Sequence, residues 1–176
     1  MKTIYSAAIA AGCMAVGIGV GFAAKQVEPG IQVIQDKPDR EAGLAALAEA
    51  EHLAGNGTWE LIAVGRAYYL SGDKAKAQTL FDRVTGGKQN ASDYQRLGEV
   101  YAEAGDNAKA EECFQKMLAL DPKDDSGQAE VGAWYIRTGQ RAKGEELLAK
   151  ALQKHPAEIW HYLRAGEALL HVPPGR

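Results

Sequence analysis

The chain has few of the residues from which catalytic and metal sites are built. It contains two cysteines, Cys13 and Cys113, and no C-x-x-C pair, so the common zinc, redox and haem-attachment motifs are absent. Its four histidines form no H-x-x-x-H sequence, and no Walker loop, dinucleotide-binding fingerprint or G-x-S-x-G elbow occurs. We therefore predict no catalytic residues, no cofactor and no metal ion, and we expect that the protein is not an enzyme.

A few residues come closest to a site of chemistry. Glu158 and His161, and again Glu167 and His171, are spaced so that they meet on one helix turn, which is also the spacing of an ordinary surface pair. Cys113 stands in a context typical of an inert, partly buried thiol. We favour the structural interpretation in each case, because the sequence offers no catalytic constellation around these residues.

The chain also lacks a strong charge of either sign. Its formal net charge is −3, and it has no run of about five like charges that would mark an interaction tail. Because binding to phosphates requires a basic face, we exclude nucleic acid as the main partner. The hydrophobic share of 46% is that of an ordinary globular domain with a real core.

Near the N-terminus charge is absent altogether. Between Lys2 and Lys25, residues 3–24 form an apolar run of 22 residues, and a helix needs about 20 to cross the hydrocarbon core of a membrane. We favour an uncleaved anchor, with a signal peptide cleaved near Ala23 as the alternative. The sequence before Cys13 resembles a lipoprotein signal only loosely. Since the positive charge precedes the run, the rest of the chain should lie across the membrane.

Glycine recurs at a fixed interval in the rest of the chain. Four glycines are separated by 33, 34 and 34 residues: Gly65, Gly98, Gly132 and Gly166. Other residues keep the same step: Tyr68, Tyr101 and Tyr135, then Gly72, Gly105 and Gly139, then Phe81, Phe114 and Leu148, and finally Pro122 and Pro156. A pattern of this kind indicates stacked structural units, each of which buries the apolar face of its neighbours.

Each unit holds two helical patterns with a glycine between them. We expect Gly72, Gly105 and Gly139 to adopt the left-handed conformation that ends a helix, followed by Asp73 and Asp106 as caps of the next helix. We also expect capping boxes that begin at Ser92 and Asp125. The glycines inside helices, Gly65, Gly98 and Gly132, cost about 1 kcal/mol each against alanine, which close helix packing would offset.

This pattern resembles the tetratricopeptide repeat, W-x2-L-G-x2-Y, then A-x3-F, then P, over about 34 residues. The likeness covers about residues 58–156. Gln89 in place of a proline and Gln128 in place of a large apolar residue are the departures. The matching segments are Leu61–Tyr68, Tyr94–Tyr101 and Gln128–Tyr135 for the first element, and Ala77–Phe81, Ala110–Phe114 and Gly144–Leu148 for the second.

The resemblance implies an all-α fold, an α-solenoid of three helix pairs. Gly43, Leu47 and Ala50 match second-helix positions, so a half repeat should cap the N-terminal end, and Tyr162 and Gly166 place a single first helix at the C-terminal end. The predicted segments are a signal anchor or signal peptide (1–24), a linker (25–38) and the solenoid (39–172), with repeats at about 58–90, 91–124 and 125–158 and a capping helix at 157–171.

In this family the first helices line a concave groove that binds peptides or helices of other proteins. Its aromatic, charged and small residues favour an amphipathic partner segment. The family's groove positions, carried over one by one, give the predicted site: Trp59, Ile62, Arg66, Tyr69, Gln95, Arg96, Glu99, Glu103, Ala133, Ile136, Arg137, Trp160 and Arg164.

The resemblance and the N-terminal segment together predict a membrane-anchored, bacterial-type adaptor. Its repeat domain would lie in the periplasm or at the cell exterior, bind other proteins or peptide segments, and serve in the assembly of an envelope or membrane complex. The alternatives are a permanent structural subunit of a membrane or extracellular complex, and a soluble secreted or periplasmic form after cleavage near Ala23. The sequence also leaves homo-oligomerisation through exposed solenoid faces open.

Overall fold

The computed structural model of the protein describes residues 30–173, and in this range the chain is helical without strands. The predicted anchor lies outside the described residues, as do residues 25–29 of the predicted linker. Among the residues that are described, no helix has the length and apolar character of a membrane span. The helices are η1 (Ile31–Val33), α1 (Asp39–Ala54), α2 (Thr58–Leu70), α3 (Lys74–Thr85), α4 (Ala91–Glu103), α5 (Asn107–Leu120), α6 (Asp125–Arg137), α7 (Arg141–Lys154) and α8 (Ile159–Leu169).

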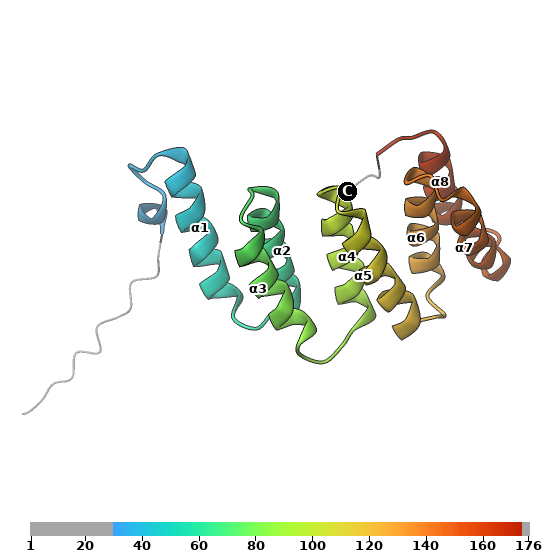
Figure 1. Cartoon of the computed structure of the whole chain (residues 1–176), viewed down its shortest axis with the longest axis horizontal. Helices are drawn as coiled ribbons and strands as arrows, with labels where there is room; N and C mark the ends of the chain where they lie inside the picture. The colour runs from blue at the N-terminus through green and yellow to red at the C-terminus, as the bar shows by residue number, and fades with distance from the viewer. Residues whose placement is uncertain (1–29, 174–176) are drawn as a thin grey trace, which may run out of the picture.

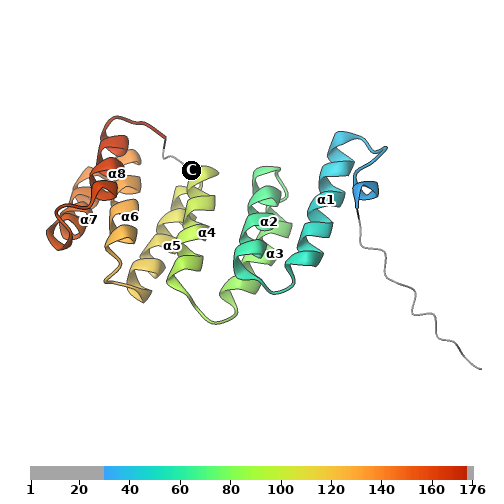
Figure 2. The same cartoon turned by 180° about the vertical axis from the view of Figure 1, so that it is seen from behind.

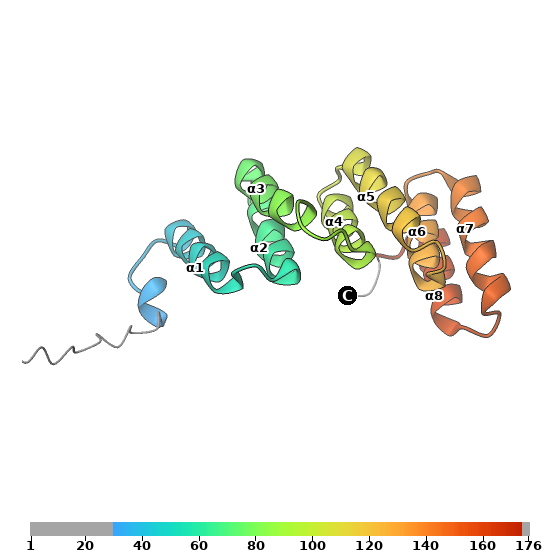
Figure 3. The ribbon, with the colours of Figure 1, turned by 90° about the horizontal axis from the view of Figure 1, so that it is seen from below.

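Six of these helices form three hairpins, α2 with α3, α4 with α5 and α6 with α7. Figure 1 shows the hairpins side by side in one row, with α1 at one end and the hairpin of α6 and α7, on which α8 packs, at the other, and Figure 2 shows the same row from behind. Seen from below in Figure 3, successive hairpins are rotated relative to one another. The predicted all-α solenoid is confirmed for the described residues, whereas the predicted boundaries of anchor, linker and repeats stay predictions.

The turn inside each hairpin follows from a glycine. Gly72, Gly105 and Gly139 have φ angles of 99°, 75° and 84°, a left-handed conformation that glycine adopts without steric cost. Asp73 and Asp106 then cap the second helices, since their carboxylates accept hydrogen bonds from the backbone N–H groups of Lys76 at 3.0 Å and Lys109 at 3.4 Å. These predictions are confirmed.

The predicted capping boxes of the first helices are wrong by one or two residues. The cap of α4 is Asn90, whose side chain accepts from the backbone N–H of Ser92 at 3.1 Å. The cap of α6 is Asp124, which accepts from the backbone N–H of Gly127 at 3.0 Å. A polar residue just before each predicted cap already satisfies the free N–H groups of the first turn, so Ser92 and Asp125 lie inside their helices.

Glycines at the hairpin interfaces allow the two helices to approach closely. A Cβ atom on Gly65 would overlap the ring of Phe81, and one on Gly98 would overlap the ring of Phe114. A Cβ atom on Gly132 would lie 2.9 Å from the carbonyl oxygen of Gly144 on the facing helix α7. The close packing that the sequence predicted for these three glycines is therefore present.

Candidate protein-binding groove

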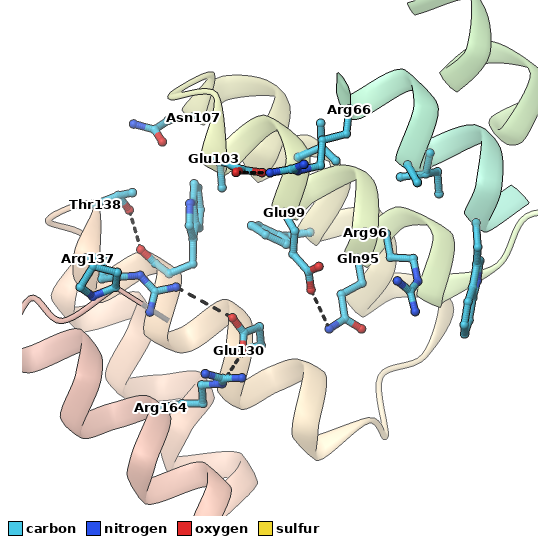
Figure 4. Close-up of a pocket in the computed structure, with 18 residues that line it drawn as sticks. Arg66, Gln95, Arg96, Glu99, Glu103, Asn107, Glu130, Arg137, Thr138 and Arg164 are labelled. Carbon is cyan, nitrogen blue, oxygen red and sulfur yellow. Dashed lines mark hydrogen bonds and ion pairs between the residues drawn. The ribbon is translucent and has the colours of Figure 1, made fainter. Parts of the chain in front are cut away.

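A groove of about 830 Å³ crosses the first helices of the three hairpins. It begins at α2, runs over α4 to α6, and ends at Arg164 of α8 (Figure 4). First helices supply most of its lining, and the second helix α5 adds Asn107 and Phe114. The lining residues are Trp59, Ile62, Ala63, Arg66, Gln95, Arg96, Glu99, Val100, Ala102, Glu103, Asn107, Phe114, Glu130, Trp134, Arg137, Thr138, Arg164 and Pro173.

One end of the groove carries an exposed aromatic side chain held by a cation. Trp59, in the first turn of α2, is 53% exposed. The guanidinium of Arg96 on α4 lies over its ring, 3.7 Å from the ring centroid. This contact fixes the indole in one orientation and leaves much of its apolar surface open to solvent, which is a common arrangement at protein interfaces.

The middle of the groove has a second tryptophan, but this one is almost completely buried. Trp134 of α6 is 4% exposed, and its ring centroid lies 5.1 Å from that of Phe114 and 5.0 Å from that of Tyr135. Its counterparts in the repeat are the much smaller Val100 of α4 and Ala168 of α8. The larger side chain fills the space between the second and third hairpins and forms part of the wall of the groove.

Most of the groove's charges are paired within the protein. Arg66 of α2 donates two hydrogen bonds to the carboxylate of Glu103 on α4, a forked ion pair across neighbouring repeats. Glu130 of α6 accepts from Arg164 of α8, with Nε and Oε2 2.7 Å apart, and lies 3.9 Å from Nη2 of Arg137 (Figure 4). Internal pairing of this kind removes the strong single-sign field that would attract a bare anion.

Arg137 and Glu99 are the charged groups of the groove whose charge is least compensated by hydrogen bonds and opposite charges. The Nη1 atom of Arg137 is buried without a hydrogen-bond partner, and burial lowers the pKa of its guanidinium while the charge of Glu130 opposes that shift. Burial in the groove and the charge of Glu130 raise the pKa of Glu99, whose carboxylate accepts from the amide of Gln95 at 3.2 Å. Both groups would gain from a polar side chain or backbone group of a bound segment.

The structure brings most of the predicted site residues together in this groove. Those that line it are Trp59, Ile62, Arg66, Gln95, Arg96, Glu99, Glu103, Arg137 and Arg164. Whether they contact a partner stays a prediction. Glu130 and Trp134 also line the groove but were not predicted to do so, although the sequence has a tryptophan at position 134 where the other repeats have alanine or valine.

Four predicted residues do not line the groove. Tyr69 is buried among Phe81 and Tyr101, and its hydroxyl donates to Asp106 at 2.9 Å. The alanines of the third repeat leave no room for a guest, because α8 packs closely on α6. Trp160 is exposed at the start of α8 but away from the groove. The residues that α6 buries in the cluster shared with α7 and α8 are Ala129, Ala133 and Ile136.

Outside the groove, an ionic cluster joins α6 to the residues after α7. Asp125 accepts from Lys154 at 2.8 Å and lies 2.5 Å from Nδ1 of His155, and these contacts hold the pKa of its carboxyl well below the usual range. His161, expected in a surface pair with Glu158, is instead buried, with Nε2 3.5 Å from Asp125. Within residues 30–173 no group of three or more His, Cys, Asp or Glu side chains is arranged to hold a metal ion.

Comparisons with known proteins agree with this architecture. The family model of the tetratricopeptide repeat matches residues 91–124, which contain α4 and α5. Among solved structures, the crystal structure of MamA is similar with a TM-score of 0.53 and 19% sequence identity, over 75% of this chain and 80% of that one. At this identity the likeness shows the fold alone. No curated protein matches the chain in sequence. Repeats of this family generally mediate contacts between proteins and are typically not catalytic.

Proposed function

Since one unit matches the tetratricopeptide repeat and the whole described chain forms a solenoid of such helix pairs, we propose that the protein is a docking scaffold for another protein. The partner contributes a segment that lies in the groove across α2, α4 and α6. The observation that carries this proposal is the exposed indole of Trp59, fixed by Arg96 at 3.7 Å, at the mouth of a groove of about 830 Å³. A pre-oriented aromatic surface stabilises a complex because little side-chain freedom is lost on binding.

The groove favours an amphipathic partner segment. Trp59 and Ile62 offer apolar contacts at one end, while Glu99 in the middle would gain from a basic side chain that offsets its repulsion by Glu130. Arg66, by contrast, is already engaged with Glu103 and offers little to an incoming carboxylate. A helix or extended segment with apolar residues on one side and a lysine or arginine beside them fits this distribution.

We place this scaffold on the non-cytoplasmic side of a membrane, where it acts in the assembly of an envelope or membrane complex. The support for this location is the uncharged run at residues 3–24 behind Lys2. A signal peptide cleaved near Ala23 would put the same domain outside the cytoplasm without an anchor. Both versions leave the groove free to bind its partner in the periplasm or at the cell exterior.

A photo-crosslinking experiment in the native host tests the docking proposal. A photoreactive amino acid at Ala63 or Ala102, which line the groove, should form adducts with one recurrent segment of a partner protein. The same amino acid at Glu112, exposed on the second helix α5, is the matched control and should not capture that segment. Equal capture at both positions, or none in the groove, would exclude docking in this groove.

Purification in mild detergent from native membranes separates the adaptor from a permanent subunit. An adaptor should be recovered with its partner at a ratio that varies with salt and dilution. A permanent structural subunit, the alternative, would keep a constant ratio to fixed neighbours. Mass spectrometry of the N-terminus in the same sample shows whether Met1 and Lys2 remain, as an anchor requires, or whether the chain begins near residue 24.

A further inference from the structure

The last helix of the solenoid exposes positions that the other first helices bury, apart from the half-buried Gln128 of α6. Tyr162, Ala165, Gly166 and Leu169 form one stripe along α8, here called the α8 stripe. Tyr162 is 53% exposed and Leu169 is 45% exposed. The matching positions of α2 and α4, which face the second helix of their own hairpin, are all buried: Leu61, Val64, Gly65 and Tyr68 in α2, and Tyr94, Leu97, Gly98 and Tyr101 in α4.

The first helix of the solenoid has the opposite half of the same interface. Gly43, Ala46, Leu47 and Ala50 form a stripe along α1, here called the α1 stripe, and all four are exposed or half-buried. They match positions that second helices bury against their first helix, Ala77, Leu80, Phe81 and Val84 in α3 and Ala110, Cys113, Phe114 and Met117 in α5. Where a first helix would precede α1, the described chain has only η1 and turns.

Within residues 30–173 both stripes are open at their glycines, while Ala165 packs partly on the α6–α7 cluster and Leu47 and Ala50 pack partly on the main core. A Cβ atom added to Gly166 or to Gly43 would meet nothing within 4 Å. At the interface of α6 and α7, by contrast, Gly132 and Gly144 lie against each other, and each carbonyl oxygen crowds the space above the other glycine. Gly166 and Gly43 occupy the positions of Gly132 and Gly144 in the repeat, so together they would reproduce this close helix contact.

From this complementarity we propose that the chain associates head to tail, with the α8 stripe of one copy packed on the α1 stripe of the next. At the junction, α8 of one copy and α1 of the next pack as the first and second helix of a hairpin do within one chain. The α1 stripe carries Leu47 four residues after Gly43, just as α7 carries Leu148 four residues after Gly144. A second copy is the occupant because the same chain carries both halves in the correct register.

Net charge favours the same pairing at long range, although each basic side chain of α7 already has an ion pair within its own copy. α1 carries four carboxylates and one arginine, whereas α7, which would be its neighbour on the second-helix side of the junction, carries four basic side chains and two glutamates. Solenoid proteins stay monomeric when their terminal helices have a polar outer face. The α8 stripe is apolar, so it favours association with another surface. A contact between two different faces of the same chain leaves one free stripe at each end of a row of copies, so the assembly extends with concentration unless the rotation closes it into a ring.

The test uses the full-length chain in mild detergent and one substitution on each stripe. Leu169→Glu introduces a charge on the exposed α8 stripe, and Ala46→Lys does so on the α1 stripe. Leu120→Glu, at an exposed leucine near the end of α5, is the matched control. Sedimentation velocity then measures association over a range of concentrations up to about 100 µM, and circular dichroism checks that each variant keeps its helix content.

The wild-type chain and the Leu120→Glu variant should form larger species as the concentration rises. When each variant is measured by itself, Leu169→Glu and Ala46→Lys should self-associate at least about tenfold more weakly than the wild-type chain. Mixed together, however, they should form a dimer of one copy each and nothing larger, because one intact α8 stripe and one intact α1 stripe remain. Gly166→Ala should also weaken association, since its Cβ atom would fill the space needed by Gly43 of the next copy, and it leaves the fold of the single chain intact.

Several results would overturn the proposal. A wild-type chain that stays monomeric at every concentration would exclude the junction. If only α8 substitutions weaken association, the contact is symmetric between two α8 helices and the pairing with α1 is wrong. If the two variants fail to form a dimer when mixed, or if another protein occupies α8 in the chain isolated from its host, a second copy is not the occupant.

Discussion

Gly98 and Gly166 occupy the same position in different repeats but have different surroundings. Gly98 lies against the ring of Phe114, whereas the space above Gly166 is open. The sequence predicted the first case, because an apolar residue recurs at a fixed distance on the following helix. It gave no information on the second, because the openness of Gly166 depends on the absence of a packed neighbour among the described residues.

Alanine substitution at the two glycines should therefore have effects of opposite sign. Gly98→Ala should lower the free energy of unfolding by roughly 1 kcal/mol or more, because overpacking against a ring that is 2% exposed outweighs the gain in helix propensity. Gly166→Ala should raise it by up to about 1 kcal/mol in dilute protein, since only the propensity gain applies. Chemical denaturation followed by circular dichroism measures both, and an equal change at the two sites would contradict the packing described here.

Glu99 should make stability depend on pH in an identifiable direction. Its pKa is raised in the folded state, so folding favours the protonated form, and stability falls as pH rises from the unfolded pKa near 4.5 through the folded pKa. Glu99→Gln should thus stabilise the protein at pH 7, by less than about 1 kcal/mol, because the carboxylate lies in the wall of an open groove, where solvent still screens its charge. The difference between variant and wild type should disappear below about pH 4, and a destabilised variant at pH 7 would refute the repulsion by Glu130.

At the scale of helices, the repeat pattern predicted the hairpins and their order well but did not predict how the third hairpin packs. Turn glycines and helix caps depend on residues that are close in sequence, so the turns and the ends of the helices could be inferred from the sequence. The position of α6 depends instead on Trp134 filling the space next to Phe114, and on α8 packing over Ala133. Such contacts join distant segments, which explains why Ala133 and Ile136 do not line the groove as predicted.

The ends of α6 and α7 are joined by Asp125, and this contact is testable. Asp125→Asn should lower the free energy of unfolding by about 1 kcal/mol at pH 7, because it removes the charged partner of Lys154 and His155. The pKa of Asp125 is lowered in the folded state, so this stability is fully present above the unfolded pKa near 3.8 and is lost as pH falls below it. Thermal unfolding of both proteins between pH 3 and 7 should show the difference shrinking toward the acidic end, and a constant difference would argue against a charged contact.

At the scale of the whole molecule, three surfaces of the described chain are available to partners: the groove, the α1 stripe and the α8 stripe. The groove crosses α2, α4 and α6, whereas the two stripes lie on α1 and α8, the first and last helices of the solenoid. Head-to-tail association would therefore leave every groove open and place copies of it at regular intervals. A scaffold arranged in this way would present several docking sites, and the gain in avidity would then compensate for a weak individual contact.

The central claim is that a partner segment binds in the groove at Trp59, and two tryptophans of this chain allow a direct test. The segment captured by crosslinking is synthesised, and its affinity is measured by titration calorimetry with the wild-type chain and with two variants. Trp59→Ala should weaken binding at least about tenfold, because an exposed, oriented tryptophan is a typical centre of binding energy. Trp160→Ala, at an equally exposed tryptophan outside the groove, should change the affinity less than about twofold. Unchanged affinity with Trp59→Ala, or a greater loss with Trp160→Ala, would contradict docking in this groove.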